Sequence, residues 1–195
     1  MKDITNLTLR LFIICALAAA ALGYTYSLTK GPIEEGARVR AEEARKAVLS
    51  EADSFEEIDV DALKADGTWT DDTEHSVEVT EAYYALTDGE KNGMTVKVTT
   101  KGYNPGIEVT IGLKADGTVE AIDIGSHEET PGLGANATRP EFTGQFADQM
   151  PLFSLTGADG TSKIDALTSA TYTSKGVVNG VNAAYDFFEA VYDKE

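Results

Sequence analysis

An uncharged apolar run near the N-terminus constrains this chain more than any other feature. Residues 11–28 contain no charged side chain, and the run begins LFIICALAAAAL. A helix of that length is about 27 Å long, close to the ~30 Å thickness of the hydrocarbon core of a bilayer. Tyr24 and Tyr26 would then lie in the aromatic belt at the far interface. The run predicts a single transmembrane helix that anchors the chain through residues 11–28.

The distribution of charge predicts the orientation of that helix. Residues 1–31 hold three basic side chains and one acidic one, whereas residues 32–195 hold 13 basic and 32 acidic side chains. Positive charge beside an apolar segment favours the cytoplasmic side. We therefore expect a cytoplasmic tip and transmembrane anchor over 1–31, with everything after it outside the cytoplasm. The alternative is a cleaved signal peptide, because Ala18 to Ala21 offers small residues to a peptidase.

Composition excludes several classes of function. The net charge of −17 repels phosphate backbones, which excludes nucleic-acid binding. Cys15 is the one cysteine, so no internal disulfide can form, and His75 and His127 are the two histidines. So few soft ligands argue against a zinc or iron–sulfur site, and we expect no metal.

Residues 32–195 predict an α+β fold in which a mostly antiparallel sheet is flanked by helices. Over 32–73 we expect a stalk helix, which continues the membrane helix with Gly31-Pro32 as a break, and then an acidic linker of loop with a short helix. Glu34 and Arg38 are spaced to pair on the stalk. The remaining domain is predicted over 74–195.

Alternation of apolar and polar residues predicts the strands of that domain. The pattern covers Val77 to Leu86, Met94 to Val98, Ile107 to Leu113 and Thr118 to Ile124. Asp88-Gly89 with Asn92-Gly93 predicts a hairpin loop between the first two strands. Two helices follow: a short one that begins at Arg139-Pro140 and carries Phe142 and Phe146, and a long amphipathic one over Thr173 to Tyr192.

The first of two motifs with chemical potential is Asp165-Ala-Leu-Thr168-Ser169-Ala170-Thr171, which Lys175 follows closely. This cluster of hydroxyl and small side chains precedes the long last helix. The free N–H groups and positive dipole end at a helix N-terminus suit a phosphate, and Lys175 adds positive charge. The alternative is a Ser/Thr-rich N-cap without a ligand.

The second motif is His127-Glu-Glu129-Thr130-Pro-Gly132-Leu133-Gly134. Glycine permits close backbone approach and positive φ, while proline stiffens the turn. Such a loop could lie against a flat ring, with Leu133 in apolar contact and Thr130 in a hydrogen bond. The alternative is an ordinary surface turn.

Together the two motifs resemble the FMN-binding domain of the G subunit of the Rnf electron-transport complex. The related domain of the C subunit of the sodium-pumping NADH:quinone reductase is similar. The Rnf family's Asp-x-x-(Ser/Thr)-Gly-Ala-Thr pattern matches Asp165 to Thr171, with Ser169 in place of the usual glycine, and its Glu-Thr-Pro-Gly-Leu-Gly loop matches Glu129 to Gly134. Gly102-Tyr103 with Gly106-Ile107 also resembles the family's entry to a central strand. The resemblance extends from the anchor to the last helix.

The resemblance implies a covalent flavin. A separate flavin transferase would esterify Thr171 with the phosphate of FMN, which would make the chain a flavoprotein and, chemically, a phosphoprotein. The remaining implied cofactor-binding residues lie in the two motifs and just after them: Asp165, Thr168, Ser169, Ala170, Lys175, Glu129, Thr130, Gly132 and Leu133. If the position of Ser169 requires positive φ, its side chain would strain the loop by roughly 1 kcal/mol.

By the same resemblance, the chain would be an electron relay inside a membrane complex that couples ferredoxin:NAD oxidoreduction to ion translocation. The chain has no evident base, nucleophile triad or metal site, so we expect a redox component and not a complete catalyst. Its partners would be the other subunits of the complex, the flavin transferase and the membrane. The alternatives are a stand-alone anchored flavoprotein, the C subunit of a sodium-pumping quinone reductase, and a non-redox acidic binding module.

Overall fold

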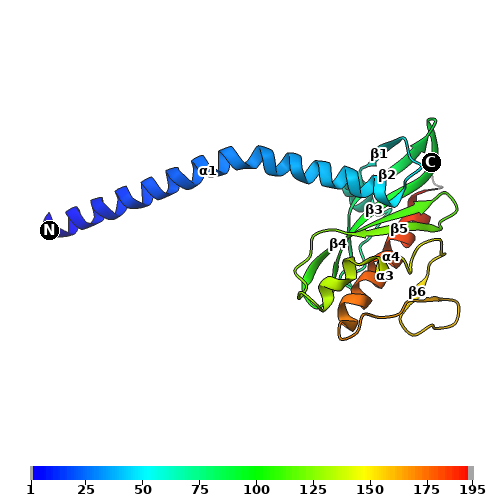
Figure 1. Cartoon of the computed structure of the whole chain (residues 1–195). Coiled ribbons are helices and arrows are strands. Elements are labelled where there is room, and N and C mark those ends of the chain that lie inside the picture. The colour runs from blue at the N-terminus through cyan, green and yellow to red at the C-terminus, as the bar shows by residue number, and fades with distance from the viewer. Residues whose placement is uncertain (1, 193–195) are drawn as a thin grey trace. The chain divides into compact units, whose positions relative to one another are not determined.

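The computed structural model describes residues 2–192, with side chains from residue 6 onward. The chain divides into two compact units, residues 1–42 and 43–195. The first unit is helical, and the second holds the sheet and the remaining helices (Figure 1).

Helix α1, Lys2–Val48, runs without interruption through Pro32. Within it, the stretch Asn6–Val48 contains an 18-residue window with a mean hydropathy of 2.0 and no buried side chains, which is long and apolar enough to cross a membrane. The predicted break at Gly31-Pro32 is therefore wrong. Proline removes one N–H donor, but the hydrogen bonds of the flanking turns hold the helix together across it.

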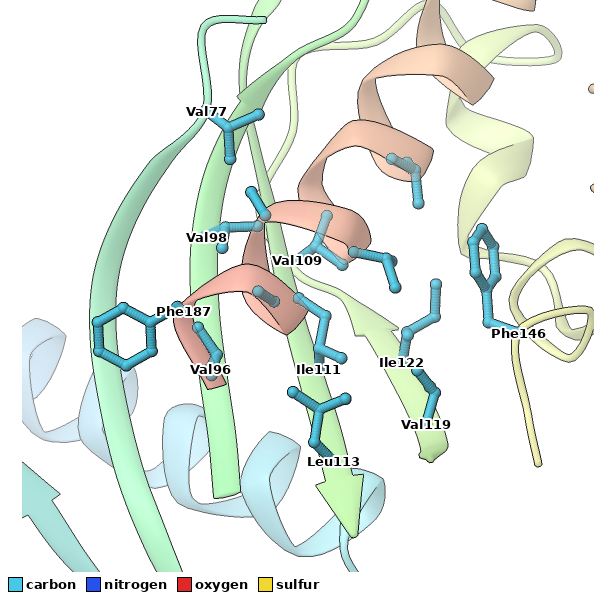
Figure 2. Packing of buried hydrophobic residues seen from close by; sticks show 14 of the residues in the cluster. Val77, Val96, Val98, Val109, Ile111, Leu113, Val119, Ile122, Phe146 and Phe187 are labelled. Atoms are coloured by element: carbon cyan, nitrogen blue, oxygen red, sulfur yellow. The ribbon is translucent and has the colours of Figure 1, made fainter. Parts of the chain in front are cut away.

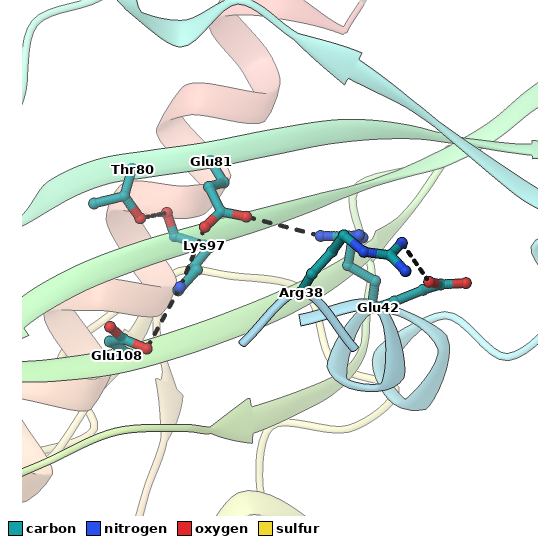
Figure 3. Close-up of polar contacts among 7 residues, drawn as sticks. Arg38, Glu42, Thr80, Glu81, Lys97 and Glu108 are labelled. Carbon is teal, nitrogen blue, oxygen red and sulfur yellow. Dashed lines mark hydrogen bonds and ion pairs between the residues drawn. The ribbon is translucent and has the colours of Figure 1, made fainter. Parts of the chain in front are cut away.

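The ion pairs of the stalk differ from the predicted one. Arg38 binds Glu35, with Nη2 and Oε1 2.8 Å apart. Figure 3 shows its second ion pair, with Glu42 at 3.8 Å. Glu34 pairs instead with Lys30 at 3.7 Å. At i,i+3 the Glu35 carboxylate receives hydrogen bonds from both Nε and Nη2 of Arg38, a two-bond geometry stronger than a single contact.

The second unit is built on a five-stranded antiparallel sheet whose strands follow one another in chain order. Its strands are β1 Ser54–Ile58, β2 Glu78–Thr87, β3 Glu90–Lys101, β4 Pro105–Lys114 and β5 Val119–Ile124. The other elements are α2 Val60–Ala65, η1 Gly134–Thr138, α3 Pro140–Thr143, the short parallel pair β6 Phe153–Ser154 and β7 Ser162–Lys163, and α4 Thr171–Val191. The α+β prediction is confirmed.

Two local predictions in the sheet region are wrong. Residues 54–58, predicted as loop, form edge strand β1. Its acidic SFEEI sequence lacks the alternation of apolar and polar residues that is typical of a strand. Only Asp88-Gly89 forms the hairpin turn, with φ of 52° and 83°. Asn92-Gly93 lies inside β3, where a Cβ on Gly93 would meet the Leu113 carbonyl and come within 3.4 Å of Leu49. The glycine therefore serves close packing and not a turn.

Helix α4 covers one face of the sheet, against β3 and β4 (Figure 2). Its predicted stripe is buried at Val177, Val181, Ala184, Phe188 and Val191. Facing it are alternate residues of the central strands: Met94, Val96, Val98, Ile107, Val109, Ile111 and Leu113. The predicted helix after Arg139 ends at Thr143, but Phe142 and Phe146 are buried as a T-shaped pair with ring centroids 5.7 Å apart.

The opposite face of the sheet is more polar. Arg45 lies over the Tyr83 ring, 4.1 Å from its centroid, and 3.7 Å from a carboxylate oxygen of Glu81. Lys97 bridges Glu81 and Glu108 across three strands at 3.2 and 3.4 Å (Figure 3). These charged residues make this face of the sheet more polar than the face that forms the core.

The start of α4 is pinned to the end of β3. Thr100 Oγ1 donates a hydrogen bond to the Gly176 carbonyl at 3.1 Å. A Cβ on Gly176 would lie 2.5 Å from the Lys101 carbonyl, so only glycine allows this approach. The first turn of α4 is thereby brought beside the β3–β4 turn and the loop after β5.

Candidate functional site

Helix α4 begins at Thr171, and no side chain caps it. The N-cap residue is Ala170, which is buried and makes no side-chain capping bond. The first N–H groups of a helix have no intrahelical partner, and they carry the positive end of its dipole. Thr171 is exposed there, and Tyr172 is 71% exposed. The helix start therefore presents an exposed hydroxyl beside unpaired backbone donors.

The neighbouring hydroxyls are buried and already bonded. Thr173 Oγ1 donates to Glu129 Oε2 at 2.6 Å. Ser174 Oγ donates to the Ala170 carbonyl at 3.0 Å and accepts from the Leu167 N–H at 2.9 Å. Both residues are at most 1% exposed. Of these three hydroxyls, Thr171 alone is free to meet a ligand or another enzyme.

Glu129 joins three segments from inside the fold. It is 6% exposed, and besides Thr173 it accepts a hydrogen bond from the Asn104 N–H to Oε1 at 2.9 Å. Gly134 and Gly102 leave room for the carboxylate: a Cβ on Gly134 would collide with Glu129 Oε2, and one on Gly102 would lie 2.8 Å from Oε1. The side chain therefore ties the 129–134 loop to α4 and to the β3–β4 turn, and it does not face the solvent.

Hydrogen bonds to backbone carbonyls shape the rest of the 129–134 loop. The Thr130 carbonyl accepts from the N–H groups of Leu133 and Ala135 at 3.1 and 3.2 Å, and Asn136 Nδ2 donates to the Gly132 carbonyl at 2.9 Å. Gly132 has φ of 79° with open space where a Cβ would project. Leu133 is 42% exposed, so its side chain is free to contact a ligand.

A groove of about 700 Å³ unites the two motifs. One side is formed by Gly132 and Leu133, and another by residues 165–169, which include Asp165, Thr168 and Ser169. The remaining wall comes from η1, α3 and the residues beside them: Asn136, Arg139, Glu141, Phe142 and Gln145.

The other predicted site residues lie outside the groove wall. Ala170 is buried beneath the helix start, and Thr130 is exposed. Lys175 lines a separate hollow of about 250 Å³ together with Tyr172 and Lys101.

Gln145 holds one edge of the groove in place. Its Oε1 accepts from the Asp165 N–H at 2.7 Å, and its Nε2 donates to the Asp165 carbonyl at 3.2 Å. The Asp165 carboxylate pairs with Lys163, with Oδ1 and Nζ 3.1 Å apart. Sequence reasoning missed Gln145, Asn104 and Arg139, because single polar residues in irregular segments leave no periodic signal.

Ser169 adopts the left-handed conformation, with φ of 61°. The resemblance raised this possibility, because glycine is usual at the position. A side chain here costs roughly 1 kcal/mol relative to an unstrained backbone. The 165–171 segment therefore holds a strained residue between the groove and the helix start.

Comparisons with known proteins identify the family to which the sequence of this site belongs. The family model described as FMN-binding domain matches residues 102–186, which contain both motifs. The chain is 36% identical to the G subunit of the Na(+)-translocating ferredoxin:NAD(+) oxidoreductase complex of Acetobacterium woodii, over 96% of this chain and 93% of that protein. It is 32% identical to the G subunit of the ion-translocating oxidoreductase complex of Methanosarcina acetivorans, over 97% and 96% of the two chains. The chain belongs to the Rnf G-subunit family.

These relatives match nearly the whole length, including the apolar helix, which supports a membrane-anchored protein. The crystal structure of the C subunit of the Na(+)-translocating NADH-quinone reductase from Parabacteroides distasonis is 21% identical, with a TM-score of 0.48. The likeness covers 59% of this chain and 64% of that one, so it is partial on both sides.

The site has the chemistry that FMN requires. The uncapped start of α4 offers N–H donors for a phosphate, and Thr171 offers an oxygen. The groove combines the apolar side chains of Leu133, Leu167 and Phe142 with polar groups at its edges, as sites for planar cofactors do. The residues present therefore fit this group.

Proposed function

We propose that this protein carries FMN covalently on Thr171 and relays electrons within a membrane-bound, ion-translocating ferredoxin:NAD oxidoreductase complex. The observation that carries the proposal is the exposed Thr171 hydroxyl at the uncapped start of α4, where the next two hydroxyls of the helix, on Thr173 and Ser174, are buried and already bonded. The names of the relatives support the complex and its reaction.

Attachment is a transfer from FAD, catalysed by a flavin transferase. The Thr171 oxygen attacks the phosphorus of the FMN half, the bond to AMP breaks, and the hydroxyl proton is released. The resulting phosphodiester keeps one negative charge, which the N–H groups and dipole at the start of α4 stabilise. Lys175 lies one turn later on the same helix, so its ammonium would add positive charge near the start of α4.

The groove residues hold and orient the ring system. Leu133 supplies an apolar contact and Gly132 lets the backbone approach closely, while Thr130, exposed just outside the groove wall, supplies a hydroxyl at the loop's edge. Asp165, Thr168 and Ser169 form the opposite edge and the sequence that the transferase reads. When bound, FMN supplies one- and two-electron chemistry. Glu129 and Ala170 are buried and contribute indirectly: Glu129 fixes the loop, and Ala170 forms the start of the helix.

Residues 11–28 anchor the protein in the membrane, with the N-terminus in the cytoplasm and the FMN-binding domain outside. The excess of basic residues before the apolar segment and of acidic residues after it supports this orientation. Protease added to right-side-out spheroplasts should digest the domain, and digestion only after lysis would reverse the orientation. The direct partners are the other subunits of the complex.

Covalent flavin is tested by expressing the chain with and without a flavin transferase and imaging a denaturing gel under ultraviolet light. The wild type and a Thr156→Val control, whose threonine is exposed and lies outside the motif, should fluoresce only with the transferase. A dark wild-type band in a proven transferase strain would contradict the proposal.

Membrane-bound subunits that co-purify with the fluorescent chain support the complex, whereas a chain that purifies alone would favour a stand-alone flavoprotein.

A further inference from the structure

Arg139 is the one cation among the residues that line the groove. It is exposed, and within the described part of the chain its guanidinium takes part in no hydrogen bond or ion pair. An arginine without an acidic partner is unexpected in this domain, because residues 32–195 carry 32 acidic and only 13 basic side chains. The Arg139 guanidinium is therefore available to interact with a ligand in the groove.

The backbone of Arg139 is fixed on both sides. Its N–H donates to the Asn136 carbonyl at 3.1 Å, and its own carbonyl accepts from the N–H groups of Phe142 and Thr143 at 2.9 and 3.1 Å. Pro140 follows directly, which restricts Arg139 to the extended conformation observed, with φ of −80° and ψ of 144°. The buried Phe142 then anchors this turn in the core. The guanidinium thus starts from a rigid base at the groove wall.

Two carboxylates also line the groove, and they differ in how far they are neutralised. Asp165 pairs with Lys163 at 3.1 Å, so much of its charge is balanced. Glu141 has no ion pair within residues 6–192. Arg139 and Glu141 are therefore the two unbalanced charges that a ligand in the groove would meet, and they have opposite signs.

We propose that Arg139 sets the reduction potential of the flavin held in this groove, an assignment that rests on the proposed function. The oxidised ring is neutral, and it takes up two electrons and one proton on full reduction near neutral pH, which leaves it with one negative charge. A nearby cation stabilises that charge and raises the potential, whereas an anion lowers it. Arg139 favours the reduced ring, and Glu141 opposes it.

The test is a redox titration of the full-length flavinylated protein in detergent, with dithionite as reductant and dye mediators. Arg139→Gln should shift the midpoint potential to a more negative value, Arg139→Lys should restore most of the wild-type value, and Glu141→Gln should shift it to a more positive value. Lys91→Gln is the matched control. It also removes one positive charge, but near the start of β3, whereas the end of β3 is the part that contacts α4. It should leave the potential unchanged.

The shifts should also shrink as salt is added, because charges at an open groove are screened over about 8 to 10 Å at physiological ionic strength. A flavinylated Arg139→Gln protein with the wild-type potential, or an equal shift in Lys91→Gln, would overturn the role of Arg139 but not the proposed function. Wild-type protein without covalent flavin would instead contradict the proposed function, and this assignment with it.

Discussion

Thr173 Oγ1 and Glu129 Oε2 lie 2.6 Å apart in the interior, where one hydrogen bond joins the start of α4 to the loop after β5. The two residues are 44 positions apart in the sequence. Glu129 belongs to the motif over 127–134, and Thr173 lies two residues after the motif over 165–171. Their contact fixes the spacing between the exposed hydroxyl of Thr171 and the exposed side chain of Leu133.

Removal of this bond should destabilise the domain. Thr173→Val keeps the shape of the side chain but leaves the buried Glu129 carboxylate without one of its two donors. We expect a loss of about 2 kcal/mol in the free energy of unfolding, typical of a hydrogen bond to a charged group. Denaturant titration measures it, with the exposed Thr156→Val as control. An equal, small effect in both variants would mean that the contact contributes nothing to stability.

Ser169→Gly should stabilise the protein. The φ of 61° strains serine, whereas glycine adopts it freely, so a gain of about 0.5 to 1 kcal/mol is expected. Thr168→Gly, at the adjacent position without positive φ, should instead lower stability. Thermal unfolding of both variants checks the pair. If both glycines destabilise the protein, the left-handed conformation of Ser169 is not a source of strain.

Leu133→Asp should alter the flavin without preventing its attachment. The side chain is 42% exposed at the groove, so a carboxylate there changes the surroundings of the ring while the core is untouched. We expect a shifted absorption spectrum or a more negative midpoint potential. Leu152→Asp, at a leucine of 44% exposure outside the groove wall, is the control. A folded, flavinylated Leu133→Asp protein with an unchanged spectrum and potential would remove the loop from the site.

Asp71 should make stability depend on pH in the acid range. Burial raises the pKa of this carboxyl, but the Lys64 ammonium at 2.7 Å and hydrogen bonds from the Val79 N–H and the Trp69 indole outweigh it, so the pKa lies below its ordinary value. A pKa lower in the folded protein than in the unfolded chain stabilises the fold above the unfolded-state pKa. That contribution is lost as the pH falls through the folded-state pKa.

Asp71→Asn should therefore reduce the free energy of unfolding by about 2 kcal/mol at neutral pH. The gap between variant and wild type should narrow as the pH falls through the lowered pKa. Urea titrations across this range measure the gap, with Asp159→Asn, an exposed aspartate, as the control. A gap of constant size at every pH would show that the charge of Asp71 is not its cause.

Regular elements could be predicted where one physical period dominates. The alternation at Met94, Val96 and Val98 and the helical stripe from Val177 to Val191 follow from burial on a single face, and both were confirmed. The acidic strand β1 was missed because edge pairing to β2 imposes its conformation. At Asn92-Gly93 the local turn signal lost to tertiary packing against Leu49 and Leu113.

The site was predictable as two motifs but not as an assembly. Residues 129–134 and 165–171 were identified from local sequence, and the groove they share depends on contacts far apart in the chain. The inward direction of Glu129 follows from its bonds to Asn104 and Thr173, which no sequence pattern records. The clamp between Gln145 and Asp165 depends in the same way on the course of the backbone.

The central claim is that FMN is esterified to Thr171, and peptide mass spectrometry tests it most directly. Trypsin should release the segment from Ile164 to Lys175, which contains Thr168, Thr171 and Thr173. After expression with a flavin transferase, fragmentation should place the mass of FMN less one water on Thr171. The adduct should disappear in Thr171→Val and persist in Thr173→Val. An adduct on Thr168 or Thr173 in the wild type, or one that survives in Thr171→Val, would contradict the account.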